Sequence, residues 1–190
     1  ESQSGERGIF NLEGIRKNAP HVRDASQIEG TNPCGEISLR NMGLCNLTEV
    51  VIKPGDTEFD VKGKVTIAAI LGTWQSTLTD FHYVRPDWRK NAEEERLLGV
   101  SLTGIYGNPL FNDPFDQSLL ERLKTLKITA RAMNYYWADK LGIERSVSIT
   151  TVKPSGTVSQ LTGVSSGIHP WFADRYIRTV RGGNQDPLTQ

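Results

Sequence analysis

Short β-rich runs alternate with long helical patterns along this chain, and that alternation limits its fold more than any other feature. The β-rich runs cover residues 44–52, 96–105, 146–152 and 175–181. Two helical patterns separate the first three runs, at roughly 61–82 and 116–141. Strands that alternate with helices pair in parallel through right-handed crossovers, so the sequence predicts an α/β fold with a parallel sheet or barrel.

Each helical pattern carries an apolar stripe that is expected to face the core. In the first pattern the stripe consists of Ile67, Ile70, Leu71, Trp74, Leu78 and Phe81. In the second it consists of Leu119, Leu123, Leu126, Met133, Trp137 and Leu141. Asp116 is expected to cap the start of the second helix and Gly142 its end. Tyr136 is also expected in the core, and the charge run at 89–96 is expected on a solvated face.

Composition excludes several classes of partner. The 190 residues carry 22 Lys and Arg against 22 Asp and Glu, which gives no reason to expect nucleic acid or an anionic membrane as a partner. No apolar run approaches the roughly 20 residues of a membrane span. Two cysteines are too few for a disulfide scaffold and favour a reducing, cytoplasmic setting. The chain lacks an initiator Met and ends in a polar stretch, so we expect a piece of a longer protein.

Both cysteines lie in one stretch, "EGTNPCGEISLRNMGLCNLTEV", at residues 29–50. If residues 32–36 are extended, Asn32, Cys34 and Glu36 share one face. A carboxylate so close disfavours the thiolate, whereas a cysteine nucleophile needs a cation or a histidine nearby. The pattern therefore suits a neutral thiol that exchanges a hydrogen atom, with Glu36 moving a proton and Asn32 orienting hydroxyl groups.

Other interpretations of the thiols stay open at this point. Two buried structural cysteines on a turn fit the spacing about as well, since free cysteine is commonly buried. A thiol–disulfide exchange protein would use Cys34 and Cys45 but needs a lowered thiol pKa. A metal site is disfavoured, because the pair is not Cys-x-x-Cys and no histidine is near.

A second stretch, "TTVKPSGTVSQL" at 150–161, leads from a β-rich run through a Pro-Ser-Gly-Thr turn into a predicted short helix. Free backbone N–H groups beside hydroxyl groups at a helix start form a natural phosphate cradle. The spacing is not that of a Walker A loop, so phosphate would be held rather than cleaved. An ordinary helix cap by Ser155 or Thr157 is the alternative. Both stretches are expected at carboxyl ends of strands, where sites of α/β folds lie.

These two stretches together resemble the ribonucleotide reductases, which convert ribonucleotides to deoxyribonucleotides. Further matches are "GERGIFNLEGIRKNA", "NAEEERLLGVSLTGI", "GVSSGIHP" and "RTVRGGNQDPL", so the resemblance covers essentially the whole chain. The separation of Cys34 and Cys45 is most similar to the monomeric, adenosylcobalamin-dependent class II enzymes. The resemblance implies half of a ten-stranded α/β barrel, with residues 1–190 as its C-terminal half-barrel portion and a catalytic finger loop at about 30–45.

The resemblance also implies roles for individual residues. Cys34 would carry a thiyl radical that abstracts the 3′ hydrogen of the ribose, and Glu36 would take the proton of the 3′ hydroxyl. Asn32 would bind the substrate hydroxyls, and Cys45 would be one of two thiols that reduce the 2′ position. The substrate phosphates would be held by the turn at about 153–159, that is by Lys153, Pro154, Ser155, Gly156, Thr157, Val158 and Ser159.

The implied cofactor is adenosylcobalamin, with His169 as its one candidate contact and a structural hydrogen bond as the alternative role. The implied partners are a ribonucleoside di- or triphosphate, an external dithiol such as thioredoxin, and the remainder of a reductase chain. The family's second reducing cysteine and its C-terminal cysteine pair have no counterpart here, so this chain alone is expected to be inactive. A non-catalytic nucleotide-binding module remains the alternative, although Glu36 beside Cys34 argues against it.

Overall fold

Two parallel strands form the centre of the computed structural model, which describes residues 8–177, 179 and 181–187. Strand β3 (Asn46–Val51) pairs with β4 (Leu98–Thr103) in register over six residue pairs. The connection between them contains α2 (Glu58–Gln75) and α3 (Pro86–Glu95), of which α3 was not predicted. The predicted strand–helix–strand order and the α/β class are confirmed for this part of the chain.

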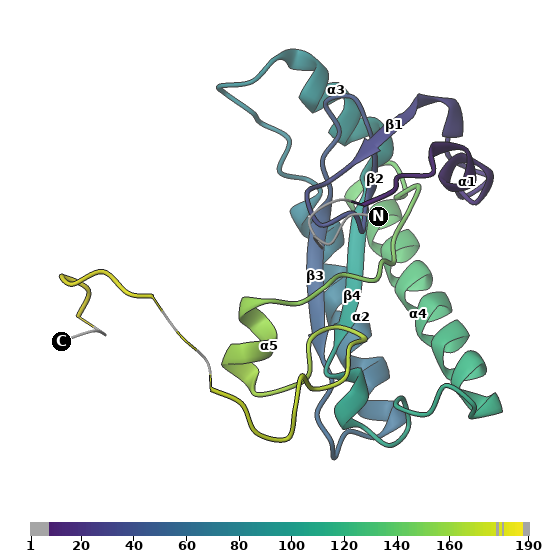
Figure 1. The fold of residues 1–190 in the computed structure, drawn as a ribbon. Helices are drawn as coiled ribbons and strands as arrows, with labels where there is room; N and C mark the ends of the chain where they lie inside the picture. Colours follow the sequence, from purple (N-terminus) through teal and green to yellow (C-terminus); the bar gives the residue numbers. More distant parts are fainter. Residues whose placement is uncertain (1–7, 178, 180, 188–190) are drawn as a thin grey trace.

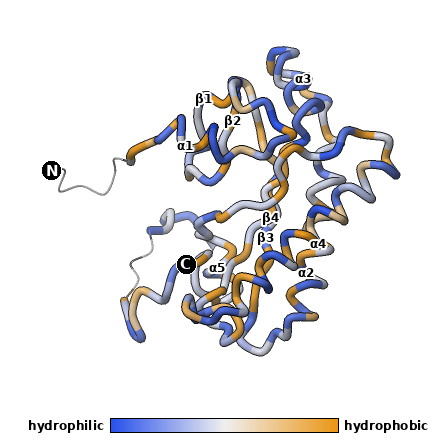
Figure 2. Tube along the Cα trace, turned by 90° about the vertical axis from the view of Figure 1, so that its right-hand side faces the viewer, coloured by the Kyte–Doolittle hydropathy of each residue, from blue (hydrophilic) through white to orange (hydrophobic). Residues whose placement is uncertain are grey.

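Helices α2 and α4 (Gln117–Leu141) cover one face of the two strands (Figure 2). Their contact with the strands is the hydrophobic core, where Val50 and Val100 meet Val65, Ala69 and Leu126. All five side chains are at most 7% exposed. Burial of such apolar side chains is the main favourable term in folding, so this layer of helices and strands contains the hydrophobic core.

The buried face of α2 differs from the predicted stripe. Ile67, Leu71 and Trp74 are 59%, 52% and 46% exposed, whereas small residues of α2 face the strands. A Cβ at Gly72 would lie 3.2 Å from Leu98 Cδ2, so the helix approaches the strands too closely for a large side chain there. The predicted stripe was wrong because close packing selected small residues. The helix also starts earlier than predicted, at a capping box between Thr57 and Asp60.

Helix α4 agrees better with its prediction. Asp116 caps its start by accepting from the Ser118 backbone N–H, and Gly142 ends it in the left-handed conformation. Trp137 contacts Trp74 edge to face at 5.1 Å between ring centroids. The prediction of a core position was wrong for Trp74 and Tyr136, because these side chains are 46% and 49% exposed.

The segment 146–152 lies beside β4, but it forms a single parallel bridge, between Thr150 and Val100, rather than the predicted strand. The Leu98 N–H donates to Ser148 O at 3.0 Å and the Thr151 N–H to Val100 O at 3.1 Å. For the predicted strand at 175–181, residues 178 and 180 lie outside the described residues, and the others have no strand structure. Helix α5 (Thr157–Thr162) confirms the predicted short helix.

An antiparallel hairpin, β1 (Ile28–Thr31) and β2 (Ser38–Arg40), was not predicted. It follows α1 (Leu12–Lys17) and the short 3-10 helix η1 (Ala25–Gln27), and a second such helix, η2 (Ile105–Gly107), follows β4. The hairpin lies beside α1 and near the amino ends of β3 and β4 (Figure 1). No helix among the described residues is long and apolar enough to cross a membrane.

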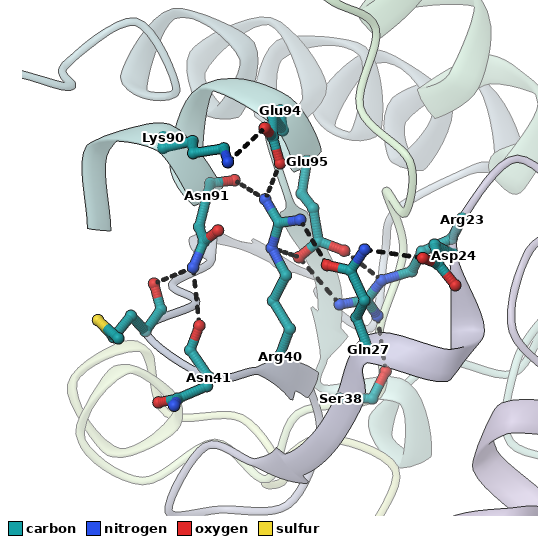
Figure 3. Close-up of polar contacts among 11 residues, drawn as sticks. Arg23, Asp24, Gln27, Ser38, Arg40, Asn41, Lys90, Asn91, Glu94 and Glu95 are labelled. Carbon is teal, nitrogen blue, oxygen red and sulfur yellow. Dashed lines mark hydrogen bonds and ion pairs between the residues drawn. The ribbon is translucent and has the colours of Figure 1, made fainter. Parts of the chain in front are cut away.

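A cluster of charged side chains attaches this hairpin to the end of α3 (Figure 3). Arg23 Nε lies 2.6 Å from Glu95 Oε1, and these side chains are only 2% and 9% exposed. Arg40 of β2 lies 2.8 Å from Glu94 and 3.6 Å from Glu95. The solvated face predicted for 89–96 was therefore wrong at Glu95 and also at Arg96, which is buried. Sequence alone did not reveal that Arg23 and Arg40 would meet this acidic run.

Candidate active site

The predicted site residues gather on the face of the strands that α2 and α4 leave free. Side chains alternate along a strand, so those at 99, 101 and 103 point away from these helices. A Cβ at Gly99 would lie 3.2 Å from Cys45 Sγ. Ser101 Oγ accepts from the Lys153 N–H at 3.2 Å, and Thr103 Oγ1 accepts from the Gly167 N–H at 2.8 Å. Figure 2 shows α5 on this side of the strands, opposite α2 and α4.

The hairpin tip that carries Cys34 is a tight turn. The Gly35 N–H donates to Asn32 O at 3.0 Å, with Pro33 at the second position, which proline favours. Gly35 has a φ of +80°, which glycine adopts without strain. Asn32 Oδ1 accepts from the Ile37 N–H at 3.0 Å and closes the loop. The prediction that residues 32–36 are extended was therefore wrong.

This turn nevertheless brings the thiol and the carboxylate to one cation. Lys153 Nζ lies 2.9 Å from Glu36 Oε1 and 3.8 Å from Cys34 Sγ. The Glu36 side chain is 1% exposed, and its Oε2 has no hydrogen-bond partner among the described residues. Thr151 Oγ1 donates to Glu36 O at 2.6 Å and fixes the loop against the segment beside β4. The Cys34 side chain is exposed. The result is a buried carboxylate, of which only Oε1 accepts a hydrogen bond from another side chain, beside an exposed thiol.

The charge of Glu36 depends on its partners. Burial opposes ionisation and is the largest single influence, but hydrogen bonds from Lys153 and neighbouring groups hold the pKa of Glu36 below its ordinary value. The same hydrogen bond raises the pKa of Lys153. The electrostatic argument from the sequence was incomplete, because it placed no cation near Cys34. Lys153 lies 117 residues from Glu36 in the chain, and no local pattern could have revealed the pair.

Cys45 has a different environment. It lies directly before β3, at the amino end of that strand, so the prediction of carboxyl-end sites was wrong for this residue. Burial, and then the negative charge of Glu36, raise the pKa of Cys45 to about 12. The thiol is thus protonated at neutral pH. This opposes a thiolate role and argues against the thiol–disulfide exchange interpretation.

The predicted phosphate turn has two buried serines whose hydroxyl groups serve the turn itself. Ser155 Oγ accepts from the Ser159 N–H at 3.2 Å, and Ser159 Oγ donates to Gly156 O at 2.9 Å. Helix α5 starts after Gly156, which has no side-chain cap, so the expected cap residue was wrong. Gly156, Thr157 and Val158 are exposed and lie at the helix start, while Pro154 is exposed before the turn.

His169 makes local hydrogen bonds. Its Nδ1 lies 3.1 Å from Ser166 O, and its backbone N–H donates to the same oxygen at 2.8 Å. The ring is exposed, so both a structural role and a ligand contact are compatible with its position. The described residues contain no group of three His, Cys, Asp or Glu side chains that could hold a metal ion.

Two hollows border this region. One, of about 580 Å³, lies between the residues of α1 and the hairpin tip and reaches Gly35. The other, of about 300 Å³, is lined mainly by apolar side chains of β4 and α4 and contains none of the predicted site residues. The first hollow therefore offers an approach to the tip that carries Cys34.

Comparison with known proteins identifies relatives along nearly the whole chain, although no family model matches. Adenosylcobalamin-dependent ribonucleoside-triphosphate reductases from Lactobacillus helveticus and Lactobacillus acidophilus are 33% and 34% identical over 97% of this chain. The enzyme from Lactobacillus leichmannii is 33% identical over 98%. A crystal structure of a B12-dependent (class II) ribonucleotide reductase matches with a TM-score of 0.62, at 27% identity over 83% of this chain.

The match involves only part of each relative. The chain spans 28% of the first two reductases, 29% of the third, and 28% of the chain in the crystal structure. The resemblance to class II ribonucleotide reductases drawn from the sequence is confirmed by these homologues.

Proposed function

We propose that the protein carrying these residues, which are homologous to the adenosylcobalamin-dependent ribonucleotide reductases, converts ribonucleotides to deoxyribonucleotides. The observation that carries the proposal is the contact of Lys153 with both Glu36 and Cys34, beside a buried Glu36 Oε2 without a described partner. Such an oxygen is costly to leave unpaired, and a substrate hydroxyl would satisfy it. A pure binding module has no need for this arrangement.

In the proposed reaction Cys34 acts first, as a thiyl radical that takes the hydrogen atom from the ribose 3′ carbon. Glu36 then accepts the proton of the 3′ hydroxyl on Oε2, which requires the ionised form that its lowered pKa favours. Asn32, whose Oδ1 is occupied by the Ile37 N–H, would offer its amide N–H to a substrate hydroxyl. At the end Cys34 returns the hydrogen atom to the 3′ carbon, so it is regenerated as a thiyl radical.

Reduction of the 2′ position needs two thiols. The 2′ hydroxyl leaves as water, and the two electrons come from Cys45 and a second thiol, which become a disulfide. The chain has only two cysteines, so the second thiol would come from outside these 190 residues. The raised pKa of Cys45, about 12, fits a thiol that delivers hydrogen in neutral form. An external dithiol such as thioredoxin would then reduce the disulfide.

The substrate is a ribonucleoside di- or triphosphate in this proposal. Its phosphates would lie at the turn 153–159, where the exposed Gly156, Thr157 and Val158 present backbone groups at a helix start. Ser155 and Ser159 would act indirectly, because their hydroxyl groups hold the turn in shape.

Adenosylcobalamin, when bound, would supply the radical that converts the Cys34 thiol to a thiyl radical. The described residues fit this requirement, because the Cys34 side chain is exposed and a hollow of about 580 Å³ reaches the neighbouring Gly35. Gly35 and Cys34 would thus border the cofactor, and His169 is kept as a further candidate contact.

We extend the proposal to architecture and location. The parallel pair of β3 and β4, with the segment 146–152 beside it, would form part of half of a ten-stranded barrel with the hairpin as its finger loop. The remainder of a reductase chain would complete the barrel. Two free thiols favour a reducing compartment, and the proposed location is the cytoplasm.

The test is deoxynucleotide formation by the protein expressed at the full length of its gene, with adenosylcobalamin, a dithiol and a ribonucleoside triphosphate or diphosphate. Wild type should form product, and Glu36→Gln should lose roughly 100-fold or more of kcat, as expected for loss of a general base. The matched control, Glu29→Gln, changes an exposed carboxylate of β1 and should keep full activity. Nucleotide binding without product would favour a binding module instead.

A further inference from the structure

Lys153 joins the phosphate turn to the thiol and the carboxylate of the hairpin tip. We propose that Lys153 is a positioning residue, whose ammonium group holds Glu36 ionised and oriented for proton transfer, and that it does not act as a phosphate ligand. The inference rests on the proposed function, since it assigns Lys153 a role at that same site. It departs from the sequence prediction, which placed Lys153 among the phosphate contacts.

The geometry fixes Lys153 from both ends. Its backbone N–H donates to Ser101 Oγ at 3.2 Å, which holds it above the free face of β4. Its ammonium group donates to Glu36 Oε1 at 2.9 Å and lies 3.8 Å from Cys34 Sγ. The side chain is 26% exposed, against 1% for Glu36. The ammonium group has three N–H donors, one of which is engaged by Glu36. A phosphate that drew it away from Glu36 would leave a buried carboxylate charge unpaired, so the contact with Glu36 takes precedence.

Orientation follows from the same hydrogen bond. Lys153 occupies Oε1, so Oε2 is the oxygen left for a substrate hydroxyl, and it has no partner among the described residues. When the substrate O–H bond breaks, its proton passes to Oε2 and the carboxyl becomes neutral. Lys153 keeps its own proton, because its pKa is raised by Glu36, and continues to donate to Oε1. The step needs no further reactant.

The charged groups around Glu36 come from several segments. Hydrogen bonds from Lys153, from the backbone N–H of Glu36 itself and from the Asn32 side chain offset burial, with Lys153 the largest of the three. Cys34 lies against the same ammonium group. Cys45 lies directly before β3, and the Glu36 charge contributes, after burial, to its raised pKa. Arg23 and Lys153 lower the Cys45 pKa, and β4 presents uncharged Gly99 and Ser101 to this region. Lys153 is therefore the cation that favours the ionised form of Glu36.

The experiment compares Lys153→Met with Lys153→Arg in the full-length protein. For the positioning role, Lys153→Met should lower kcat by roughly 10- to 100-fold, leave KM for the nucleotide little changed, and move the acidic limb of the pH profile to higher pH. Lys153→Arg should keep most of the wild-type kcat, and the acidic limb of its pH profile should lie at the wild-type pH. Lys62→Met, on the exposed surface of α2, is the matched control and should behave as wild type. A rise in KM with an unmoved pH profile would show a phosphate ligand and overturn the proposal.

A second readout needs neither substrate nor cofactor. The infrared difference between wild type and Glu36→Gln isolates the Glu36 carboxylate band, and its loss on acidification gives the titration midpoint. The corresponding difference between Lys153→Met and the double variant Lys153→Met/Glu36→Gln should give a higher titration midpoint for Glu36. An unchanged midpoint would refute the role of Lys153 even in an active enzyme. A higher midpoint in a protein without reductase activity would support the Lys153–Glu36 coupling and count against the proposed function alone.

Discussion

Glu36 and Cys45 lie in the same small region of the molecule, and burial opposes the ionisation of both, yet their pKa values shift in opposite directions. Lys153 compensates the buried carboxylate, so the pKa of Glu36 lies below its ordinary value. Burial and the Glu36 charge both oppose ionisation of the Cys45 thiol, so its pKa rises to about 12. At neutral pH the site thus pairs an ionised base with a protonated thiol, which are the states that the proposed chemistry needs.

The raised pKa predicts how Cys45 responds to alkylation. Only the thiolate reacts, so at pH 8 Cys45 should be modified by iodoacetamide far more slowly than an ordinary thiol, with a rate that climbs until the pH approaches about 12. The Cys34→Ser protein, followed peptide by peptide by mass spectrometry, isolates this thiol from its neighbour. Rapid modification of Cys45 at pH 8 in the folded protein would contradict its described environment.

Sequence reasoning at the residue scale grouped residues that do lie close together, but it assumed the wrong backbone geometry. It placed Asn32, Cys34 and Glu36 together on an extended strand, whereas a turn closed by Gly35 brings Cys34 and Glu36 to the same ammonium group. Lys153, the partner that both side chains contact, was assigned another role. Contacts between residues more than a hundred positions apart depend on the tertiary fold, and a local pattern contains no information about them.

At the scale of elements, side-chain packing on the face of β3 and β4 that α2 and α4 leave free depends on Gly99. A Cβ there would lie 2.4 Å from Leu47 Cδ2 and 3.2 Å from both Cys45 Sγ and Ile37 Cδ1. Gly99→Ala should therefore destabilise the folded protein by about 1–3 kcal/mol, as expected for overpacking. Gly30→Ala in β1 is the control, since nothing lies within 4 Å of its added Cβ. Equal thermal unfolding of the two variants would show that the strands adapt without cost.

The attachment of the hairpin to α3 gives a second prediction at this scale. Glu95→Gln leaves Arg23 buried without its counter-ion, which typically costs roughly 3–5 kcal/mol. Hydrogen exchange of the amides in 28–40 should become faster, because the hairpin loses its anchor. Glu121→Gln, which alters an exposed ion pair with Lys124 on α4, should leave that exchange unchanged. Unaltered protection in Glu95→Gln would mean that other contacts hold the hairpin.

Elements were predictable where local chemistry determines them. The ends of α4 followed from Asp116 and Gly142, and β3 and β4 from their β-rich runs. The buried face of α2 was not predictable from apolar spacing, because its small and valine side chains pack against the strands while Ile67, Leu71 and Trp74 remain outside. The hairpin was missed because its strands are three and four residues long and are held by long-range ion pairs.

For the whole molecule, the central observation is that different parts of the chain cover the two faces of one strand pair. One face packs on α2 and α4 and provides the core, and the other carries the hairpin tip, Cys45 and Lys153. Alternation along β4 is sufficient to produce this division. The α/β class was therefore predictable, while the contact between the hairpin tip and the phosphate turn needed the three-dimensional arrangement.

The most direct test of the account is the deoxynucleotide yield of Cys34→Ser beside wild type, in full-length protein with adenosylcobalamin, a dithiol and a ribonucleoside triphosphate. Serine is similar in size to cysteine and would occupy the same exposed position. Its O–H bond, however, is too strong to lose a hydrogen atom and form a radical like that of the thiol. The account predicts product from wild type and none above background from Cys34→Ser, with unchanged folding by circular dichroism. Product from Cys34→Ser at a rate near that of wild type would contradict the account.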